Sequence, residues 1–223
     1  MKIELHAHTS ETSPCGHICA GDMVSLYKKA GYQAMVVTDH YSKWVLEQHN
    51  LLDADKNTVI DHILAGYHAA SAAAGSDFSV WPGTEVNLLE SPNDYLLYGI
   101  TEEFLYEAPL LYTLSLKELS ALCHKHDILL FQAHPYRTYC TPADPALLDG
   151  VEVFNGNLRH ESHNEKALDW QQSKHLLFSS GSDFHEIEDL ARGGIDTAKE
   201  VHNLKELCAL LRTGEYQVIH PEQ

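Results

Sequence analysis

The sequence predicts an α/β protein whose sheet is mainly parallel, and three observations support this fold class. Short apolar runs of strand type alternate with amphipathic stretches along all 223 residues, as in sheets whose strands are joined by helices. The chain has no internal repeat and no Gly/Ser-rich linker. Its apolar content of 44% is ordinary for one globular core. We therefore expect a single domain over residues 1–223, with a sheet that is either open or closed into a barrel.

Eight short apolar runs are the expected strands, because polar or turn-forming residues bound each of them. In chain order they read KIEL, QAMVVT, FSVWPG, DYLLYGI, ILLFQA, VEVF, LLFSS and YQVI. Amphipathic stretches between them predict helices over residues 22–30, 57–74, 115–126, 161–174 and 203–213. Two of these stretches carry terminal signals: Ser115 and Glu118 fit a capping box, and Gly214 is a suitable stop after the last helix.

The composition argues against several classes of protein. No apolar run is long enough to cross a bilayer, and MKIELHAH is too polar for a signal peptide. Five irregularly spaced cysteines make a disulfide framework improbable, which suits a cytoplasmic protein. A formal net charge of −17 repels a polyphosphate backbone. We expect neither a membrane nor a long nucleic acid as a partner, and the oligomeric state stays open.

Six of the expected strands lead directly into a histidine, a carboxylate or an amide. In chain order these residues are His6 and His8, Asp39 and His40, Glu85, His134, Asn155, and Asp183 and His185. His6 and His8 point to the same side, because residues i and i+2 of a strand share a face. The carboxyl ends of the strands form the rim at which α/β barrels build their active sites. We therefore expect the six strand ends to converge on one site.

The side chains at these strand ends are typical metal ligands. Imidazole and carboxylate groups suit zinc, manganese or iron better than calcium or a thiolate cluster. Five histidines and two carboxylates are more ligands than one tetrahedral ion uses, which indicates at least two ions with a carboxylate able to bridge them. Two neighbouring ions polarise a phosphoryl oxygen and activate a water. Hydrolysis of a phosphate ester is the reaction that follows most naturally.

The motifs HAH, TDH, AHP and GSDFH, together with Glu85, resemble those of the PHP family, the polymerase and histidinol phosphatase domains. They occur in the family's order between residues 6 and 185, so the resemblance covers most of the chain. It implies a distorted, TIM-like (β/α)7 barrel with a two- or three-metal site at its carboxyl rim. It also implies a histidinol-phosphatase-like phosphoesterase acting on a small phosphorylated molecule.

The resemblance also implies roles for individual residues. His6, His8, Glu85 and Asp183 would hold one ion, Glu85 would bridge to a second ion bound by His134, and His40 and His185 would hold a third. Asp183, His185 and Glu85 are accordingly the expected catalytic residues, acting with the metals on an activated water. Asp39 and Asn155 would orient the ligands. Arg137, Arg159 and Arg192 are candidates for binding the substrate phosphate, because a guanidinium group matches its oxygens.

The sequence departs from the family pattern in two places. Many members have a histidine on the strand after the glutamate, where this chain offers only Asp94. Many also have an aspartate or histidine shortly after HxH, where this chain offers Glu11, Cys15 and His17. Cys15 precedes Gly16 much as an aspartate precedes glycine in related loops. These departures leave the number and identity of the metals open.

Two other functions are compatible with some of the same residues. An amidohydrolase-type barrel that cleaves C–N bonds also begins with HxH on a strand. That barrel would use a modified lysine on a middle strand, and FSVWPG, DYLLYGI and ILLFQA contain none. A non-catalytic PHP module would carry a degraded set of ligands, whereas seven of the expected positions are intact here.

Overall fold

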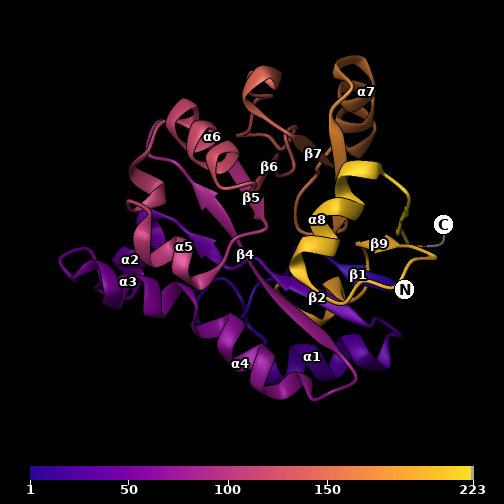
Figure 1. Cartoon of the computed structure of the whole chain (residues 1–223), viewed down its shortest axis with the longest axis horizontal. Helices are drawn as coiled ribbons and strands as arrows, with labels where there is room; N and C mark the ends of the chain where they lie inside the picture. The colour runs from indigo at the N-terminus through magenta and orange to yellow at the C-terminus, as the bar shows by residue number, and fades with distance from the viewer. Residues whose placement is uncertain (222–223) are drawn as a thin grey trace.

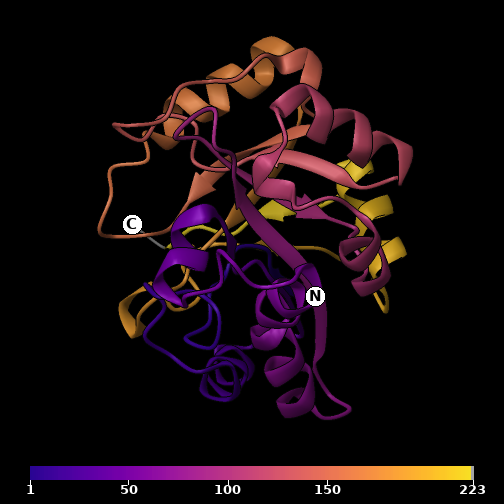
Figure 2. The same cartoon turned by 90° about the vertical axis from the view of Figure 1, so that its left-hand side faces the viewer.

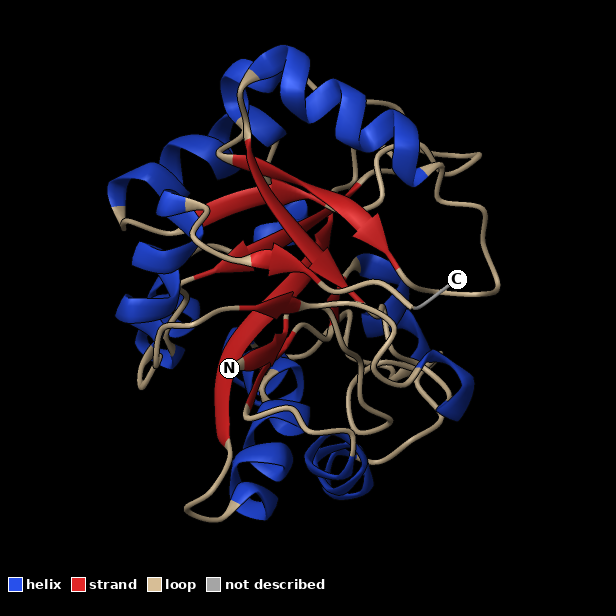
Figure 3. Ribbon diagram, turned by 90° about the vertical axis from the view of Figure 1, so that its right-hand side faces the viewer, coloured by secondary structure: helices blue, strands red, loops and turns tan. Residues whose placement is uncertain are grey.

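The computed structural model describes residues 1–221, and its centre is a strongly curved sheet that closes almost into a barrel (Figure 3). The strands pair in the order β10-β9-β1-β2-β4-β5-β6-β7-β8, and β3 pairs with β4. Their bounds are β1 Lys2–Glu4, β2 Ala34–Val37, β3 His40–Tyr41, β4 Ser79–Asn87, β5 Asp94–Tyr98, β6 Leu129–Gln132, β7 Gly150–Asn155, β8 Leu177–Gly181, β9 Ile195–Asp196 and β10 Gln217–Val218. The predicted barrel-like α/β fold is confirmed.

The helices surround the sheet (Figure 1 and Figure 2). Their bounds are α1 Ala20–Lys29, α2 Lys43–Gln48, α3 Lys56–Ile63, α4 Ala65–Ala74, α5 Glu102–Glu107, α6 Leu116–Lys125, α7 Asn164–Lys174 and α8 Leu204–Thr213. Helices α1 and α4 pack against each other, while α6, α7 and α8 cover β6, β7 and β8. The predicted capping box of Ser115 and Glu118 is present at the start of α6. Among residues 1–221, no helix has the length and apolar character that a membrane crossing needs.

The helix predicted over residues 57–74 is divided into α3 and α4. The hydroxyl of Thr12 causes a local break, because it accepts a hydrogen bond from the Gly66 amide and donates one to the His62 carbonyl. A side chain that enters the backbone ladder in this way bends a helix. The short helices α2 and α5 were not predicted; Ser42 and Thr101 cap their first turns.

The sheet is less uniformly parallel than the sequence suggested. Strand β5 runs antiparallel to both β4 and β6, and β9 runs antiparallel to β1. Only residues 88–93 separate β4 from β5, and a parallel connection needs a crossover of about a dozen residues or more. Because β5 is reversed, Asp94 at its start pairs with Asn87 at the end of β4. Asp94 therefore lies at the rim where the parallel strands end.

The barrel closes along a seam between the first strand and β8. Just beyond these strands, Ala7 and Phe184 form a parallel bridge, and the His8 amide donates to the Phe184 carbonyl at 3.0 Å. Gly181 makes this approach feasible, because a Cβ atom placed there would lie 2.1 Å from the Cβ of His6. The two ends of the seam carry HAH and GSDFH, so closure brings the first and last motifs together.

Candidate metal centre

The seven predicted metal ligands lie together at the carboxyl end of the barrel. Seven side chains from five segments form this group: His6 and His8 after β1, His40 in β3, Glu85 in β4, His134 after β6, and Asp183 and His185 after β8. His6, His8 and Glu85 are fully buried. His134 and Asp183 have positive φ angles of 26° and 50°. Strained backbone of this kind costs about 1–3 kcal/mol per residue and is concentrated at functional sites.

Glu85 lies between two pairs of imidazoles. Its Oε1 atom is 3.0 Å from His134 Nε2 and 3.4 Å from His6 Nε2. Its Oε2 atom is 2.8 Å from His40 Nδ1 and 3.4 Å from His8 Nε2. Each carboxylate oxygen therefore faces its own pair of nitrogen donors, which is the arrangement of a carboxylate that can join two cations.

Asp183 connects a second set of imidazoles to a buried arginine. Its Oδ1 atom is 3.4 Å from His6 Nε2, 3.3 Å from His8 Nε2 and 3.4 Å from His185 Nδ1. Its Oδ2 atom accepts a hydrogen bond of 2.5 Å from Arg137. The carboxylate is thus fixed on one side and directs its other oxygen toward three imidazoles.

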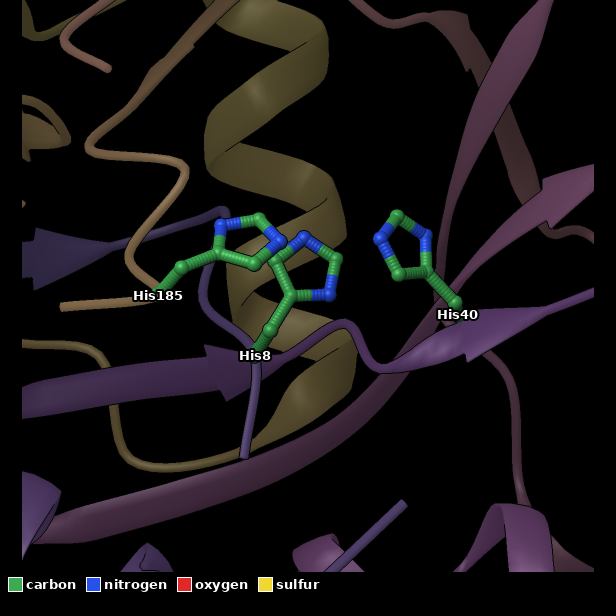
Figure 4. A group of neighbouring side chains, drawn as sticks. All are labelled: His8, His40 and His185. Atoms are coloured by element: carbon green, nitrogen blue, oxygen red, sulfur yellow. The ribbon is translucent and has the colours of Figure 1, made fainter. Parts of the chain in front are cut away.

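His8, His40 and His185 form what we call the three-histidine cluster (Figure 4). One nitrogen of each ring lies within 4.8 Å of the other two. The ring of His8 lies between the others, with its centroid 4.2 Å from that of His40 and 4.3 Å from that of His185. Similar groups of three donors are formed by His6, Glu85 and His134, and by His6, His8 and Asp183.

The donor atoms of this site fit divalent cations. His6 Nε2, His8 Nε2 and Glu85 Oε2 are buried, and none of them has a described partner in hydrogen-bonding geometry, although His40 Nδ1 lies 2.8 Å from Glu85 Oε2. A buried polar atom without a partner costs about 1–3 kcal/mol, and a cation would provide a partner for all three atoms. Imidazole nitrogen and carboxylate oxygen are ligands of zinc, manganese and iron.

Charges in the site shift the pKa values of its residues in opposite directions. Burial alone would lower the pKa of His6, but Asp183, Glu152 and Glu85 raise it well above the usual range. Burial alone would also lower the pKa of His40, but Glu85 and Cys15 together raise it well above the usual range. By contrast, burial and the neighbouring imidazoles hold the pKa of His8 well below its usual range.

Two buried glutamates that the sequence analysis missed orient the ligands. Glu152 in β7 lies 2.8 Å from His6 Nδ1, and its other oxygen accepts a hydrogen bond from the His134 amide at 3.0 Å. Glu4 in β1 accepts hydrogen bonds from the amides of His6 and Ser182, across the seam. The available signal was a carboxylate inside an otherwise apolar strand, as in KIEL and VEVF.

Asp39 and Asn155 form hydrogen bonds with residues around the proposed metal ligands. The Asp39 carboxylate accepts hydrogen bonds of 2.7 Å from the Thr9 amide, the Thr9 hydroxyl and the Ser13 hydroxyl. Burial raises the pKa of Asp39 to about 6 despite these bonds. Asn155 accepts from Arg137 at 2.9 Å and donates to Glu152 at 2.9 Å. Asp39 therefore fixes the loop after β1, and Asn155 links two orienting groups.

A cavity of about 170 Å³ opens over the ligands. Arg137 and Arg159 line it. Arg137 is almost completely buried, and Arg159 pairs with Asp189 at 2.7 Å while its side chain stays 35% exposed. Arg192 is not among the residues that line this cavity, and its Nε atom donates to the Gly156 carbonyl. Two of the three predicted arginines thus reach the site.

Of the four candidates for the missing ligand positions, two line the cavity and two do not. Cys15 and Asp94 line the cavity, and Asp94 lies 3.9 Å from His134 with its pKa raised by burial to about 6. Glu11 instead accepts hydrogen bonds from the Ala20 amide at the start of α1. His17 is 64% exposed beside Glu186.

The thiol of Cys15 interacts with His185 and His40. Burial alone would raise its pKa, but hydrogen bonds with these two imidazoles lower it to about 6. Among the residues missed as candidates, Cys140 forms a further group of three donors with Asp94 and His134. His160 also lines the cavity.

Solved structures share this fold, whereas no protein-family model and no curated protein matches the sequence significantly. A two-domain protein from Bacteroides vulgatus, containing a predicted PHP-like metal-dependent phosphoesterase, has a TM-score of 0.69 and 18% identity. The match covers 99% of this chain and 64% of that chain. This chain therefore spans less than two thirds of that protein.

Two further structures broaden the comparison. An amidohydrolase from Chromobacterium violaceum, solved with bound sulfate, has a TM-score of 0.58 and 14% identity, and the match covers 100% of this chain and 99% of that one. Endonuclease Q, solved with a 27-mer duplex substrate, has a TM-score of 0.62 and 14% identity, with 95% and 56% coverage. The resemblance to PHP proteins is thus confirmed at the level of the fold.

The comparison with endonuclease Q corrects one expectation. We inferred from the net charge of −17 that no long nucleic acid would be a partner, and that inference is wrong, because a protein of this fold binds duplex DNA at its active site. Net charge sums over the whole surface. Metal ions and arginines determine the local field that a phosphate group meets in a site.

Proposed function

We propose that this chain is a metal-dependent phosphoesterase with two or three divalent ions in its barrel rim. The observation that carries the proposal is the position of Glu85, whose two oxygens each face a separate pair of imidazoles. Three buried donor atoms without partners support it further. The fold shared with a predicted metal-dependent phosphoesterase is consistent with this chemistry.

The proposed ligand sets divide the seven side chains among the ions. His6, His8, Glu85 and Asp183 would hold the first ion, Glu85 and His134 the second, and His40 and His185 the third. When bound, such ions polarise a phosphoryl oxygen and lower the pKa of a water. The protein contributes by holding the ligands rigidly: Glu152 fixes the ring of His6, and Arg137 fixes Asp183.

The cavity favours a substrate that inserts its phosphoryl group and leaves the remainder outside. Its volume of about 170 Å³ is below the roughly 300–1,000 Å³ of pockets that enclose a whole ligand. Arg159 lies in the cavity wall, and its guanidinium group can contact phosphate oxygens. Tyr139 and His160 also line the cavity, with ring centroids 6.4 Å apart. We infer a phosphate ester of a small molecule as the substrate.

The first test is metal content and turnover on the same sample. Mass spectrometry of gently purified protein should find two or three equivalents of metal, and p-nitrophenyl phosphate hydrolysis should stop on chelation and return with added metal. Glu85→Gln should lower turnover about a hundredfold or more, as removal of one charge-stabilising group does elsewhere. The control is Glu47→Gln, because Glu47 is exposed on α2. No metal and no turnover after reconstitution would refute the proposal.

A substrate panel separates the remaining alternatives. Bis(p-nitrophenyl) phosphate and a DNA duplex with an abasic site test for phosphodiester cleavage. A dihydropyrimidine and an N-acyl amino acid test for C–N hydrolysis. Turnover of the aryl monoester above that of every other compound would support a small phosphorylated substrate. Preferred cleavage of the duplex or of a C–N bond would overturn that assignment.

A further inference from the structure

Two arginines line the cavity, and their guanidinium groups have different contacts. Arg137 is almost completely buried and donates hydrogen bonds to Asp183 and Asn155, so it serves the proposed metal ligands. The side chain of Arg159 is 35% exposed, and its Nη2 atom pairs with Asp189. Among residues 1–221, the guanidinium group of Arg159 forms no other ion pair. Its remaining N–H groups are therefore available to phosphate oxygens.

Asp189 is a fully buried carboxylate that gathers three donors on one oxygen. It ends the 3-10 turn Ile187–Asp189. Its Oδ2 atom lies 2.7 Å from Arg159 Nη2 and accepts hydrogen bonds of 3.0 Å from the amides of His185 and Glu186. The other oxygen, Oδ1, is buried and has no hydrogen-bond partner among the described residues. A buried acceptor without a partner is costly, so stability alone does not explain how this carboxylate is placed.

The backbone of Arg159 is fixed to the same part of the barrel rim. Asn157 is buried, lines the cavity and accepts a hydrogen bond of 2.9 Å from the Arg159 amide. The Nδ2 atom of Asn157 in turn donates to the Asp183 carbonyl at 2.9 Å. Arg159 is thus joined at its backbone and at its side chain to the segment after β8 that bears Asp183 and His185.

Holding an arginine at both ends has a greater effect on binding than on stability. A partly exposed ion pair contributes little to the free energy of unfolding. A side chain that is already ordered, by contrast, loses less conformational entropy when a ligand binds to it. The two attachments also set the position of the guanidinium group relative to the proposed metal ligands, because they lead to the same segment.

We propose that Asp189 is a positioning residue that holds the guanidinium group of Arg159 toward the phosphate of the substrate. The inference rests on the proposed phosphoesterase function and adds to it a residue that does not itself line the cavity. Asp189 acts through Arg159, and the same oxygen supports the amide of His185. Its loss should therefore weaken phosphate binding more than it slows the chemical step.

The affinity for inorganic phosphate tests the proposal without turnover. Calorimetric titration of the metal-loaded protein gives the Kd of phosphate, which is a product of the proposed reaction. Asp189→Asn keeps an oxygen that can accept from the two backbone amides but removes the charge that pairs with Arg159. We expect the phosphate Kd to rise about 10- to 100-fold, the range for groups that position a charged or ligating side chain. The KM for p-nitrophenyl phosphate should rise similarly, with a much smaller change in kcat.

A double-mutant cycle separates positioning from a structural role. In an Arg159→Ala background, Asp189→Asn should not weaken phosphate binding further, because the group that it positions is gone. Glu188→Gln is the matched control, since Glu188 is the exposed neighbour in the same turn, and it should bind phosphate as the wild type does. Asp189→Ser is a second variant with a hydroxyl acceptor, used if Asp189→Asn loses its metal or its far-ultraviolet circular dichroism spectrum.

The outcomes distinguish this inference from the function on which it rests. An unchanged or tighter phosphate Kd in the Asp189 variant would overturn the positioning role alone. A rise of equal size with and without Arg159 would also overturn it, because Asp189 would then act through another group. Wild-type protein that holds metal but neither binds phosphate nor hydrolyses p-nitrophenyl phosphate would overturn the proposed function, and this inference with it.

Discussion

At the scale of single residues, buried carboxylates determine how the imidazoles are presented. Glu152 contacts the Nδ1 atom of His6 and the backbone amide of His134, so one side chain orients two ligand-bearing positions. It is 1% exposed. The hydrogen bond at Nδ1 leaves Nε2 of His6 directed toward Glu85 and Asp183. A hydrogen bond to the ring nitrogen that does not bind the metal fixes the orientation and the tautomer of a metal-binding histidine.

Replacing Glu152 tests this orienting role. Glu152→Gln keeps the shape of the side chain but removes the charge that holds His6. We expect the affinity for zinc to fall about 10- to 100-fold, as measured by competition titration, with an unchanged far-ultraviolet circular dichroism spectrum. Glu165→Gln is the matched control, because Glu165 is 70% exposed at the start of α7. Equal zinc affinities for the two variants would contradict the role.

Proton release on metal binding follows from the raised pKa values of His6 and His40. In the metal-free protein both rings keep their protons near neutral pH, whereas a metal binds only the neutral imidazole. The apparent affinity should therefore increase as pH rises toward those pKa values and decrease as pH falls. Calorimetry at pH 7 in two buffers of different ionisation enthalpy should show at least one proton released. Equal binding enthalpies in the two buffers would contradict the predicted proton release.

At the scale of the elements, strand positions could be predicted from the sequence, but strand directions could not. All eight predicted strands are present, because each is a short apolar run with clear ends. The direction of β5 follows from the short link that joins it to β4. The composition of an apolar run does not show in which direction the strand runs. The break between α3 and α4 depends on Thr12, which lies far from both helices in the sequence.

The candidate site could be predicted to a similar extent. The seven proposed ligands were recognisable because each follows an apolar run in the sequence. Glu4 and Glu152 were missed because apolar residues flank each of them within its run, and sequence alone does not show that such a carboxylate is buried. Cys15 could be named only as one of several candidates, since its loop is positioned by Asp39 and Gly16 through contacts that depend on the tertiary structure.

Close packing at the seam between β1 and β8 requires a glycine at position 181. Gly181→Ala would place a methyl group against His6, and overpacking of this kind costs about 1–3 kcal/mol or more. We expect a decrease of that size in the free energy of unfolding, measured with urea. In Gly21→Ala the nearest atom lies 3.8 Å away within α1, so this control should be neutral or more stable. A Gly181→Ala variant as stable as the control would contradict the packing at the seam.

At the scale of the whole molecule, the metal centre joins parts of the barrel that are distant in sequence. His6 and His8 lie on one side of the seam, and Asp183 and His185 lie on the other. Ions held between them would cross-link the first and last motifs of the chain. The native state should therefore bind metal far more strongly than the unfolded chain, in which these residues are not assembled.

The difference in metal affinity between the native state and the unfolded chain predicts that the thermal stability depends on metal. At a free ion concentration one hundred times the Kd, a single site stabilises the folded state by about 2.7 kcal/mol. For a chain of this size that corresponds to a rise in Tm of about 5–10 °C. Calorimetric scans with zinc and with a chelator should show this difference, and it should shrink for Glu85→Gln. Identical melting temperatures in zinc and in chelator would contradict it.

The seam also determines when the metal centre can first exist during protein synthesis. His6 and His8 leave the ribosome well before their partners Asp183 and His185 are made. Because a domain generally folds as a unit, the set of proposed ligands stays incomplete until β8 closes against β1. We therefore expect metal uptake to follow closure of the barrel, and a nascent chain stalled before Asp183 should lack the complete centre.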